Sequence, residues 1–314
     1  MGGLLSRKLE SGWMAVGLLP TELNLVHGLR EPGTRPLILQ MGSFPIEGAA
    51  ASTAKALAEK MHLKRYRCQT LMPAGEYQLL TVDAPNVPPA ELKSAVRWSV
   101  QGLIDFHIDD ATVDVLDIPP DPETRAAAHS MYAVVARNDR VKSHIDRFQQ
   151  AAIPLSVIDI EETAQRNVGI LCEEADQRGV ALLYVAETYC LLTINLKGEL
   201  YLSRRIELGP GQAFRNVEGA RDSVLSHILT EIQRTLDVFE LQYQFAAIGK
   251  LVIAPEPKES GICEYLAQNM DVAVVPLEFG AILDFAEGLE PDRAMQWKHF
   301  HLIGAVLRQE SKAL

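Results

Sequence analysis

The sequence predicts a two-lobed α/β fold in which one α/β unit occurs twice. Two stretches share a pattern of three strand-like runs followed by a helical run, and a segment of different character separates them. The chain has 314 residues, which is enough for two lobes that each bury a core. A cleft between two such lobes is the natural place for a ligand.

The first unit consists of short apolar runs that are separated by turn-forming residues. Its three strand-like runs are Trp13–Leu18, Glu22–Leu29 and Pro36–Gln40. A helix is predicted over Ala51–His62, because Ala, Leu, Lys and Glu are good helix formers. A further strand, Gln78–Val82, completes the unit.

The second unit repeats this order from residue 180 onward. Its strand-like runs are Val180–Ala186, Tyr189–Leu196 and Glu199–Ile206, and Lys197-Gly198 predicts a hairpin turn between the last two. Apolar residues recur at helical spacing over Asp222–Tyr243, which predicts a long helix that buries one stripe against a sheet. The remaining elements are two strands and a helix between them: Leu251–Ile253, Val272–Val275 and Gly261–Asn269.

The segment between the two units predicts a small α+β subdomain. Prolines at 88 and 89 suit the first turn of a helix that continues over Leu92–Ile104. Two strands, a second helix and a last strand follow at Ala111–Ile118, Met131–Val135, Asp139–Ala151 and Pro154–Ile158.

These elements divide the chain into five parts. They are the first lobe (1–87), the inserted subdomain (88–158), a return helix of the first lobe (159–178), the second lobe (179–288) and a C-terminal segment that closes on the first lobe (289–314).

The charge balance argues against a nucleic-acid-binding protein. The chain has 41 Asp and Glu against 30 Lys and Arg, a net charge of −11, whereas phosphate binding needs a concentrated basic surface. The same balance disfavours broad adsorption to an anionic membrane, although a small basic patch would not show in such an average. Two short basic clusters, Lys64-Arg65-Tyr66-Arg67 and Arg204-Arg205, predict a partner-docking face or salt bridges.

The pattern of apolar residues and cysteines predicts a soluble cytoplasmic protein. The longest apolar runs are far shorter than the roughly 20 residues that a membrane-spanning helix needs, and the N-terminus lacks a secretory apolar region. Cys68, Cys172, Cys190 and Cys263 are widely separated, which favours free buried thiols over a zinc site or disulfides.

No motif points to a metal or a catalytic centre. The pair in His299-Phe300-His301 would share one face if extended, but a packed or surface pair is the favoured interpretation. Asp105, Asp109 and Asp110 lack the spacing of a calcium loop and predict a solvated turn. Gly209-Pro210-Gly211 lacks the Lys and Ser/Thr of a phosphate loop and predicts a turn.

Five segments, in order along the chain, resemble one protein family. They are Pro88–Trp98 with Leu103–Asp110, Val157–Glu161, Ser203–Ile206 with Gly209, Glu231–Leu236, and Ile303–Arg308. Together they resemble the PilM branch of the actin-like ATPase superfamily, which includes the MSHA pilus protein MshI and is related to the type II secretion L proteins and FtsA. The resemblance implies an actin-like (duplicated ribonuclease H-like) two-lobed fold with a small inserted α+β subdomain.

The chain departs from the superfamily at the positions that hold Mg-ATP. In each lobe an Asp-x-Gly turn, with a glycine that lets backbone amides reach phosphate, is expected. The corresponding positions, with the downstream lysine and the adenosine-side Gly-Gly, are Gly17, Leu19, Asn24, Tyr184, Ala186, Pro255 and Glu256. We therefore expect no cofactor, no catalytic residues and no enzymatic activity.

The resemblance implies a scaffold role at the inner face of a bacterial inner membrane. A groove between the first lobe and the subdomain would take the short N-terminal tail of a PilN-like single-span membrane protein, so that membrane contact is indirect. The residues expected near this groove are Arg97, Trp98, Leu103, Ile104, Phe106 and Arg137. For each residue taken alone, a role without a partner is at least equally favoured: core packing for Trp98 and a solvated charge for each arginine. A pilus or secretion assembly ATPase and a second copy of the chain are further partners left open.

Two other functions remain as alternatives. An active ATPase with divergent phosphate loops would have to recruit nearby carboxylates, and these are Asp83, Asp159, Glu161 and Glu187. A division-type filament former related to FtsA would need a C-terminal amphipathic helix, for which the residues after Arg308 are too few.

Overall fold

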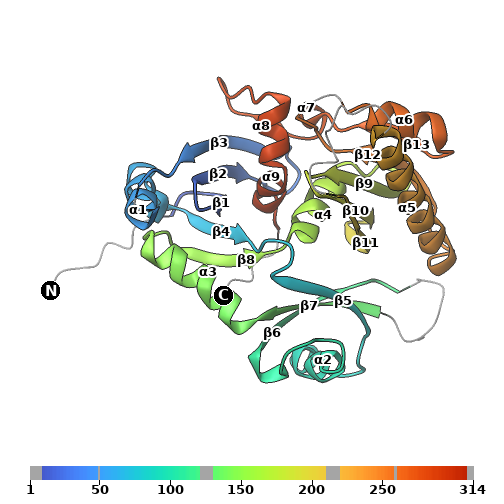
Figure 1. Cartoon of the computed structure of the whole chain (residues 1–314), viewed down its shortest axis with the longest axis horizontal. Coiled ribbons are helices and arrows are strands. Elements are labelled where there is room, and N and C mark those ends of the chain that lie inside the picture. The colour runs from blue at the N-terminus through green and yellow to red at the C-terminus, as the bar shows by residue number, and fades with distance from the viewer. Residues whose placement is uncertain (1–8, 49, 121–129, 210–219, 258–259, 310–314) are drawn as a thin grey trace.

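The computed structural model describes residues 9–48, 50–120, 130–209, 220–257 and 260–309 (Figure 1). The described strands form three sheets of six, five and three strands. Figure 1 shows the two larger sheets side by side, each in its own lobe, with the small sheet below them.

The first-lobe sheet has the strand order β14-β3-β2-β1-β4-β8. Its strands are β1 (Trp13–Leu18), β2 (Glu22–Leu29), β3 (Leu37–Pro45), β4 (Arg67–Leu71), β8 (Leu155–Asp159) and β14 (Asp284–Phe285). β1, β2 and β3 pair antiparallel, whereas β4 and β8 continue the sheet in parallel. Helices α1 (Ala50–Lys60) and α3 (Asn138–Gln150) contribute to the core on one face of this sheet, which includes Met14, Leu25 and Phe148.

The second-lobe sheet repeats this arrangement with the order β11-β10-β9-β12-β13. Its strands are β9 (Gly179–Val185), β10 (Tyr189–Leu196), β11 (Glu199–Glu207), β12 (Ile248–Ile253) and β13 (Ala273–Pro276). Helices α5 (Ala220–Gln242) and α6 (Ile262–Asn269) pack on the sheet core. Both lobes therefore place an antiparallel three-strand meander before two parallel strands, which confirms the duplicated, actin-like fold.

Two helices fill the space between the lobes. α4 (Glu161–Leu171) and α9 (Phe300–Val306) pack against each other and belong to a core that joins Ala15 of the first sheet to Leu182 of the second. Gly304 permits this close approach, because a Cβ there would lie 2.1 Å from the Ala164 carbonyl oxygen. The short helices α7 (Phe279–Ile282) and α8 (Arg293–Lys298) precede α9.

The inserted subdomain is a three-stranded antiparallel sheet with the order β5-β7-β6. Its strands are β5 (Tyr77–Asp83), β6 (Ala111–Asp117) and β7 (Ser130–Arg137). Helix α2 (Leu92–Val100) covers one face. The other face packs on the second lobe, where the Tyr132 hydroxyl donates a hydrogen bond to the Tyr201 carbonyl oxygen at 3.2 Å. The 3-10 turns η1 (Leu63–Arg65) and η2 (Ile108–Asp110) complete the described elements.

Three strands lie in a different sheet from the one predicted. The run at Gln78–Val82 is β5, but it belongs to the subdomain, and β4 takes its predicted place in the first lobe. β8 belongs to the first lobe and not to the subdomain, and β14 pairs with β3 although it falls in the predicted second-lobe segment. The predicted boundaries at residues 88, 158 and 288 shift accordingly.

The prediction of free buried thiols is confirmed at three of the four cysteines. Cys68, Cys172, Cys190 and Cys263 are free thiols, and the first three are buried. In the described part of the chain, no helix is both long enough and apolar enough to span a bilayer.

Candidate functional site

The first-lobe positions expected to hold phosphate are committed to other contacts. Gly17 on β1 pairs with Asn24 on β2, and Leu19 in the turn between them is 45% exposed. The Asn24 amide donates a hydrogen bond to Glu22 at 2.9 Å and accepts one from the Ser43 hydroxyl. Glu22 in turn pairs with Lys298 at 2.6 Å. These contacts form a local polar network at the turn, in which the charges of Glu22 and Lys298 neutralise each other.

The second-lobe position is filled by aromatic rings. Tyr184 on β9 is buried, and its ring stacks on Phe300 at 5.0 Å and on Trp297 at 6.5 Å between ring centroids. The edge of His301 lies 4.4 Å from the same ring, and the Trp297 indole donates to the Val185 carbonyl oxygen at 2.7 Å. α8 and α9 supply these rings, so the C-terminal segment packs against Tyr184, at the position that the resemblance relates to an Asp-x-Gly turn.

The adenosine-side positions border a pocket of about 190 Å³ at the carboxyl ends of β12 and β13. Pro255, Glu256, Cys263, Glu264 and Arg293 are among its lining residues. The Glu256 carboxylate accepts a hydrogen bond from the Ser260 hydroxyl at 2.7 Å, and burial raises the pKa of Glu256. Glu256 therefore places a carboxylate beside this pocket, at a position where the resemblance implies a Gly-Gly.

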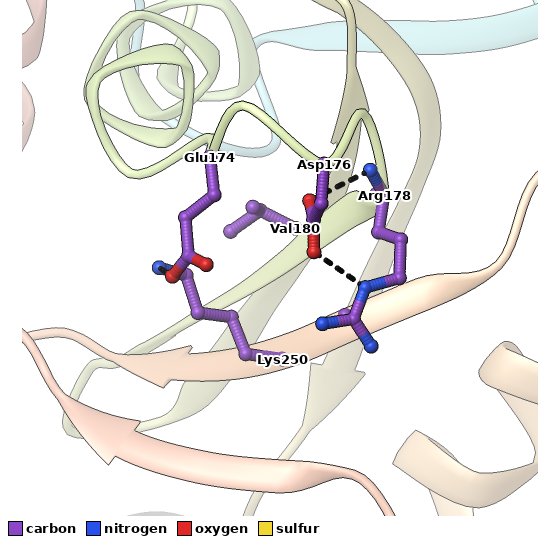
Figure 2. A pocket seen from close by; sticks show the side chains of 7 residues that line it. Glu174, Asp176, Arg178, Val180 and Lys250 are labelled. Atoms are coloured by element: carbon purple, nitrogen blue, oxygen red, sulfur yellow. Dashed lines mark hydrogen bonds and ion pairs between the residues drawn. The ribbon is translucent and has the colours of Figure 1, made fainter.

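A second, much smaller pocket lies at the other end of the same sheet (Figure 2). Two ion pairs line it: Asp176 with Arg178 at 2.6 Å, and Glu174 with Lys250. Its volume is about 20 Å³, which is room for one water molecule. Because its charges neutralise each other, this pocket is not a candidate ligand site.

A buried charged network joins all three parts of the molecule, and we call it the junction network. Arg205 of β11 lies 2.8 Å from the Glu161 carboxylate and 3.7 Å from that of Glu162, both on α4. Tyr189 of β10 donates to Glu161 at 2.9 Å and lies under the Arg205 guanidinium, 4.0 Å from ring centroid to cation. Tyr77 of β5 donates to Glu162, which links the subdomain to both lobes.

The two glutamates of the junction network differ in pKa. Burial opposes the charged form of Glu161, but the Arg205 guanidinium and the hydrogen bonds from Arg205 and Tyr189 outweigh it, so the pKa of Glu161 is lowered. Burial dominates at Glu162 and raises its pKa. Arg205, which lies closer to Glu161, therefore stabilises the charged form of Glu161 more than that of Glu162.

The carboxylates considered for an ATPase do not converge on one site. Asp159 pairs with Arg308 at 2.9 Å and accepts a hydrogen bond from Thr163, and Glu161 is held in the junction network. Asp83 ends a subdomain strand and Glu187 lies in the β9–β10 turn, and both are exposed. Among the described residues, no group of three or more His, Cys, Asp or Glu side chains could hold a metal ion.

The histidine pair is packed inside the protein, in line with the favoured interpretation. His299 and His301 lie in and beside a helix rather than an extended segment. The His299 ring nitrogens lie 2.9 Å and 3.1 Å from the carbonyl oxygens of Met295 and Gly42. His301 lies 3.2 Å from the Gln165 side-chain oxygen, and burial lowers the pKa of His301 to about 4.

Two further predicted turns have different outcomes. Asp109 and Asp110 form the exposed turn η2, with Asp105 just before it, as predicted. Pro210 and Gly211 lie outside the described residues.

The predicted partner residues divide into structural and exposed groups. Arg97 donates hydrogen bonds to the carbonyl oxygens of Ala111, at 2.9 Å, and of Ile108, so it fixes the turn after α2. Arg137 covers the Phe106 ring at 5.3 Å and pairs with Asp139 at 3.2 Å. The hydrogen bond with Asp139 raises the pKa of Arg137, so this cation is always charged.

The apolar members of the set are the ones that face solvent. Trp98 is 72% exposed and Leu103 is 55% exposed, whereas Ile104 and Phe106 pack partly against the subdomain core. The alternative that Trp98 packs in the core is therefore wrong. Its exposure follows from helical spacing, because Val96 and Val100 face the sheet and position 98 falls between them on the opposite side.

We call the surface around the exposed residues of this set the α2 surface. It consists of Trp98, Leu103, Ile104, Phe106 and Arg137. Helix α2 covers the outer face of the subdomain, away from the second lobe (Figure 1). Large exposed aromatic and aliphatic side chains are typical of protein-binding sites.

Comparison with known proteins gives a family and a fold. The family model described as type IV pilus assembly protein PilM matches residues 52–219, more than half of the chain. Among solved structures, the chain is similar to one titled PilM-PilN type IV pilus biogenesis complex, with 17% identity, coverage of 96% of this chain and 98% of that chain, and a TM-score of 0.72.

More distant similarity extends to two other solved structures. The cytoplasmic domain of EpsL, an inner membrane component of the type II secretion system of Vibrio cholerae, shows 10% identity, 94% coverage of both chains and a TM-score of 0.48. A Bacteroides thetaiotaomicron protein with an actin-like ATPase fold and unknown function shows 8% identity, coverage of 90% of this chain and 93% of that chain, and a TM-score of 0.46. No curated protein matches the chain.

Proposed function

The chain belongs to the PilM family of type IV pilus assembly proteins, and from this premise we propose that it is a non-catalytic scaffold of a type IV (MSHA-like) pilus or a related type II secretion platform. In this role it binds the N-terminal cytoplasmic tail of a PilN-like single-span inner-membrane protein. The solved complex of PilM with PilN supports a partner of this kind. The chain then works at the cytoplasmic face of the inner membrane through that partner.

The packing around Tyr184 is the observation that supports the non-catalytic role. Tyr184 stacks on rings of α8 and α9, and in the first lobe Glu22 bonds Asn24 and pairs with Lys298. An actin-like ATPase needs acidic residues and open glycine backbone at these places to hold metal and phosphate. The junction network supplies, from the chain's own side chains, the bridge between lobes that a bound nucleotide would otherwise supply.

We assign the partner tail to the α2 surface on the outer face of the subdomain, in place of the groove between the first lobe and the subdomain that the resemblance implied. Trp98 and Leu103 offer the apolar contact area, and Arg137 offers a cation that Phe106 and Asp139 hold in place. Arg97 contributes by fixing the turn that presents Leu103 and Phe106. A short peptide gains most of its affinity from a few such anchors.

Calorimetric titration of the partner's N-terminal peptide into purified protein tests this assignment. The double variant Trp98→Ala/Leu103→Ala is expected to weaken binding at least about tenfold. The matched control is Val238→Ala/Leu241→Ala, which removes two exposed apolar side chains from α5 and should leave affinity unchanged. Equal affinity of the α2 variant and the wild type would remove the α2 surface from the proposal.

A second candidate function is an ATP-binding protein, and the pocket at Pro255 and Glu256 is the observation that favours it. This pocket lies where the superfamily holds the adenosine side. Titration with Mg-ATP decides between the two functions, since clear micromolar binding would replace the scaffold role by a nucleotide-dependent one. Two further partners remain predictions: a pilus assembly ATPase and a second copy of the chain.

A further inference from the structure

One face of the first lobe carries a positive charge that the rest of the chain does not share. Residues 50–67, which form α1, η1 and the start of β4, contain five Lys and Arg and one Glu, so their net charge is +4. The whole chain has a net charge of −11, which leaves −15 for the other residues. We call this the basic face, and its cations are Lys55, Lys60, Lys64, Arg65 and Arg67.

All five cations of the basic face are exposed to solvent. Arg65 pairs with Glu10, and Arg67 lies over the Trp13 ring at 5.0 Å. Lys55, Lys60 and Lys64 make no ion pair with the described residues. Three ammonium groups are therefore available to an anionic partner.

The segment that carries these cations is anchored in the first-lobe core. Leu63 and Ala58 are buried in the first-lobe core, and the Glu10 amide donates to the Arg65 carbonyl oxygen at 2.7 Å. Tyr66, the aromatic residue among the cations, packs edge-on against His27 at 4.8 Å. α3 runs beside α1 (Figure 1) and adds the exposed Arg140 and Lys142, of which Lys142 pairs with Asp146.

We propose that the basic face binds the anionic surface of a lipid bilayer. Lysine ammonium groups are compact, mobile point charges, which suits a layer of mobile headgroups better than a fixed bidentate site. A single-stranded nucleic acid would be held by exposed aromatic rings on which bases stack, but Tyr66 is half-buried against His27. The basic face thus adds a direct membrane contact to the indirect one made through a membrane partner.

The contact is expected to be weak for the isolated chain and effective when the chain is tethered. Surface charges are screened by salt, with a Debye length of about 8 Å at physiological ionic strength. A single-span partner that holds the chain close to the bilayer raises the effective concentration of lipid, so that a few cations suffice to orient the scaffold. The lipid contact itself needs no partner and can be measured without one.

Vesicle co-sedimentation of the full chain tests the proposal. The probes are vesicles of phosphatidylcholine alone and vesicles in which part of it is replaced by phosphatidylglycerol. The test variant is Lys55→Gln/Lys60→Gln/Lys64→Gln, and the control is Lys93→Gln/Lys197→Gln/Arg234→Gln, which removes three exposed cations elsewhere. Both variants change the net charge from −11 by the same three charges.

We expect the wild type and the control to bind the anionic vesicles at about 20 mM salt and to lose most binding at about 300 mM. The test variant should bind at least about tenfold more weakly, and no form should bind the neutral vesicles. Equal losses in the two variants, or binding to neutral vesicles, would overturn the proposal. An absence of vesicle binding, together with binding of polyaspartate that the test variant loses, would also overturn it and assign the basic face to an acidic protein.

Discussion

The space between the lobes and the outer face of the subdomain use similar residue types in opposite ways. Between the lobes, Tyr184 stacks on Trp297 of α8 and on Phe300 of α9, and Arg205 pairs with Glu161. On the subdomain, Trp98 and Leu103 face solvent, and Arg137 lies over the Phe106 ring. Packing between buried rings stabilises the fold, whereas exposed apolar side chains remain available for a partner. This contrast is why we propose the α2 surface, and not the space between the lobes, as the partner site.

Removing the aromatic plug should have the largest effect on stability. Tyr184→Ala is expected to lower the free energy of unfolding by about 3–5 kcal/mol, because the ring is buried between Trp297 and Phe300. Urea denaturation measures the change. The control Tyr184→Phe keeps the ring and loses only the long hydrogen bond to the Trp297 carbonyl oxygen at 3.4 Å, so it should cost less than about 1 kcal/mol. Similar costs for both variants would contradict the role of the ring.

Breaking the junction network should have the next largest effect. Arg205→Ala leaves Glu161 without its partner in a largely buried place and is expected to cost about 3 kcal/mol. The neighbouring Arg204 is a natural control, since its side chain is 55% exposed and its partner Glu231 keeps a second cation, Arg234, at 2.8 Å, so Arg204→Ala should cost less than about 1 kcal/mol. Urea denaturation of both variants checks this order, and a reversed order would show that the junction is not a structural clamp.

Mild acid should destabilise the fold through His301. Its pKa is lowered by burial from 6.5 to about 4, so the unfolded chain binds a proton in a pH range where the folded chain does not. Stability is therefore full above pH 6.5 and falls as pH decreases towards 4, by about 2 kcal/mol at pH 5. Thermal or urea unfolding at several pH values measures the slope. His301→Gln should flatten it between pH 7 and 5, and an unchanged slope would assign the effect to other groups.

Truncating the α2 surface should have the smallest effect on stability and a clear effect on binding. Trp98→Ala/Leu103→Ala removes only exposed side-chain area, so the free energy of unfolding should change by less than about 0.5 kcal/mol. Partner-peptide affinity should fall at least about tenfold, as measured by calorimetry. A variant that unfolds easily would mean that these side chains support the subdomain instead.

Strand patterns and helical spacing predicted most of the fold, and one strand shows where they fail. The hairpin at Lys197-Gly198 forms as predicted, and both residues have positive φ. β4 escaped prediction because Gln69 and Thr70 are buried in its centre, so that a central strand looks polar. β5 was then assigned to the first lobe in its place.

The site was predictable only where local spacing decides it. The exposure of Trp98 follows from the period of α2, whereas the expected loss of phosphate-binding residues rests on the resemblance and stays a prediction. The junction network is not, since Tyr77, Glu162 and Arg205 lie far apart in the chain and only the packing of three sheets brings them together. Likewise, nothing near Arg97 in sequence indicates that it binds the carbonyl oxygens of the turn at Ile108 and Ala111.

The most direct test of the central claim is the affinity of the partner's N-terminal peptide measured by calorimetry with and without about 1 mM Mg-ATP. If the cleft is filled and the α2 surface carries the function, the peptide binds with the same affinity in both conditions, and Mg-ATP alone gives no binding heat. Micromolar binding of Mg-ATP that changes the peptide affinity would contradict this account.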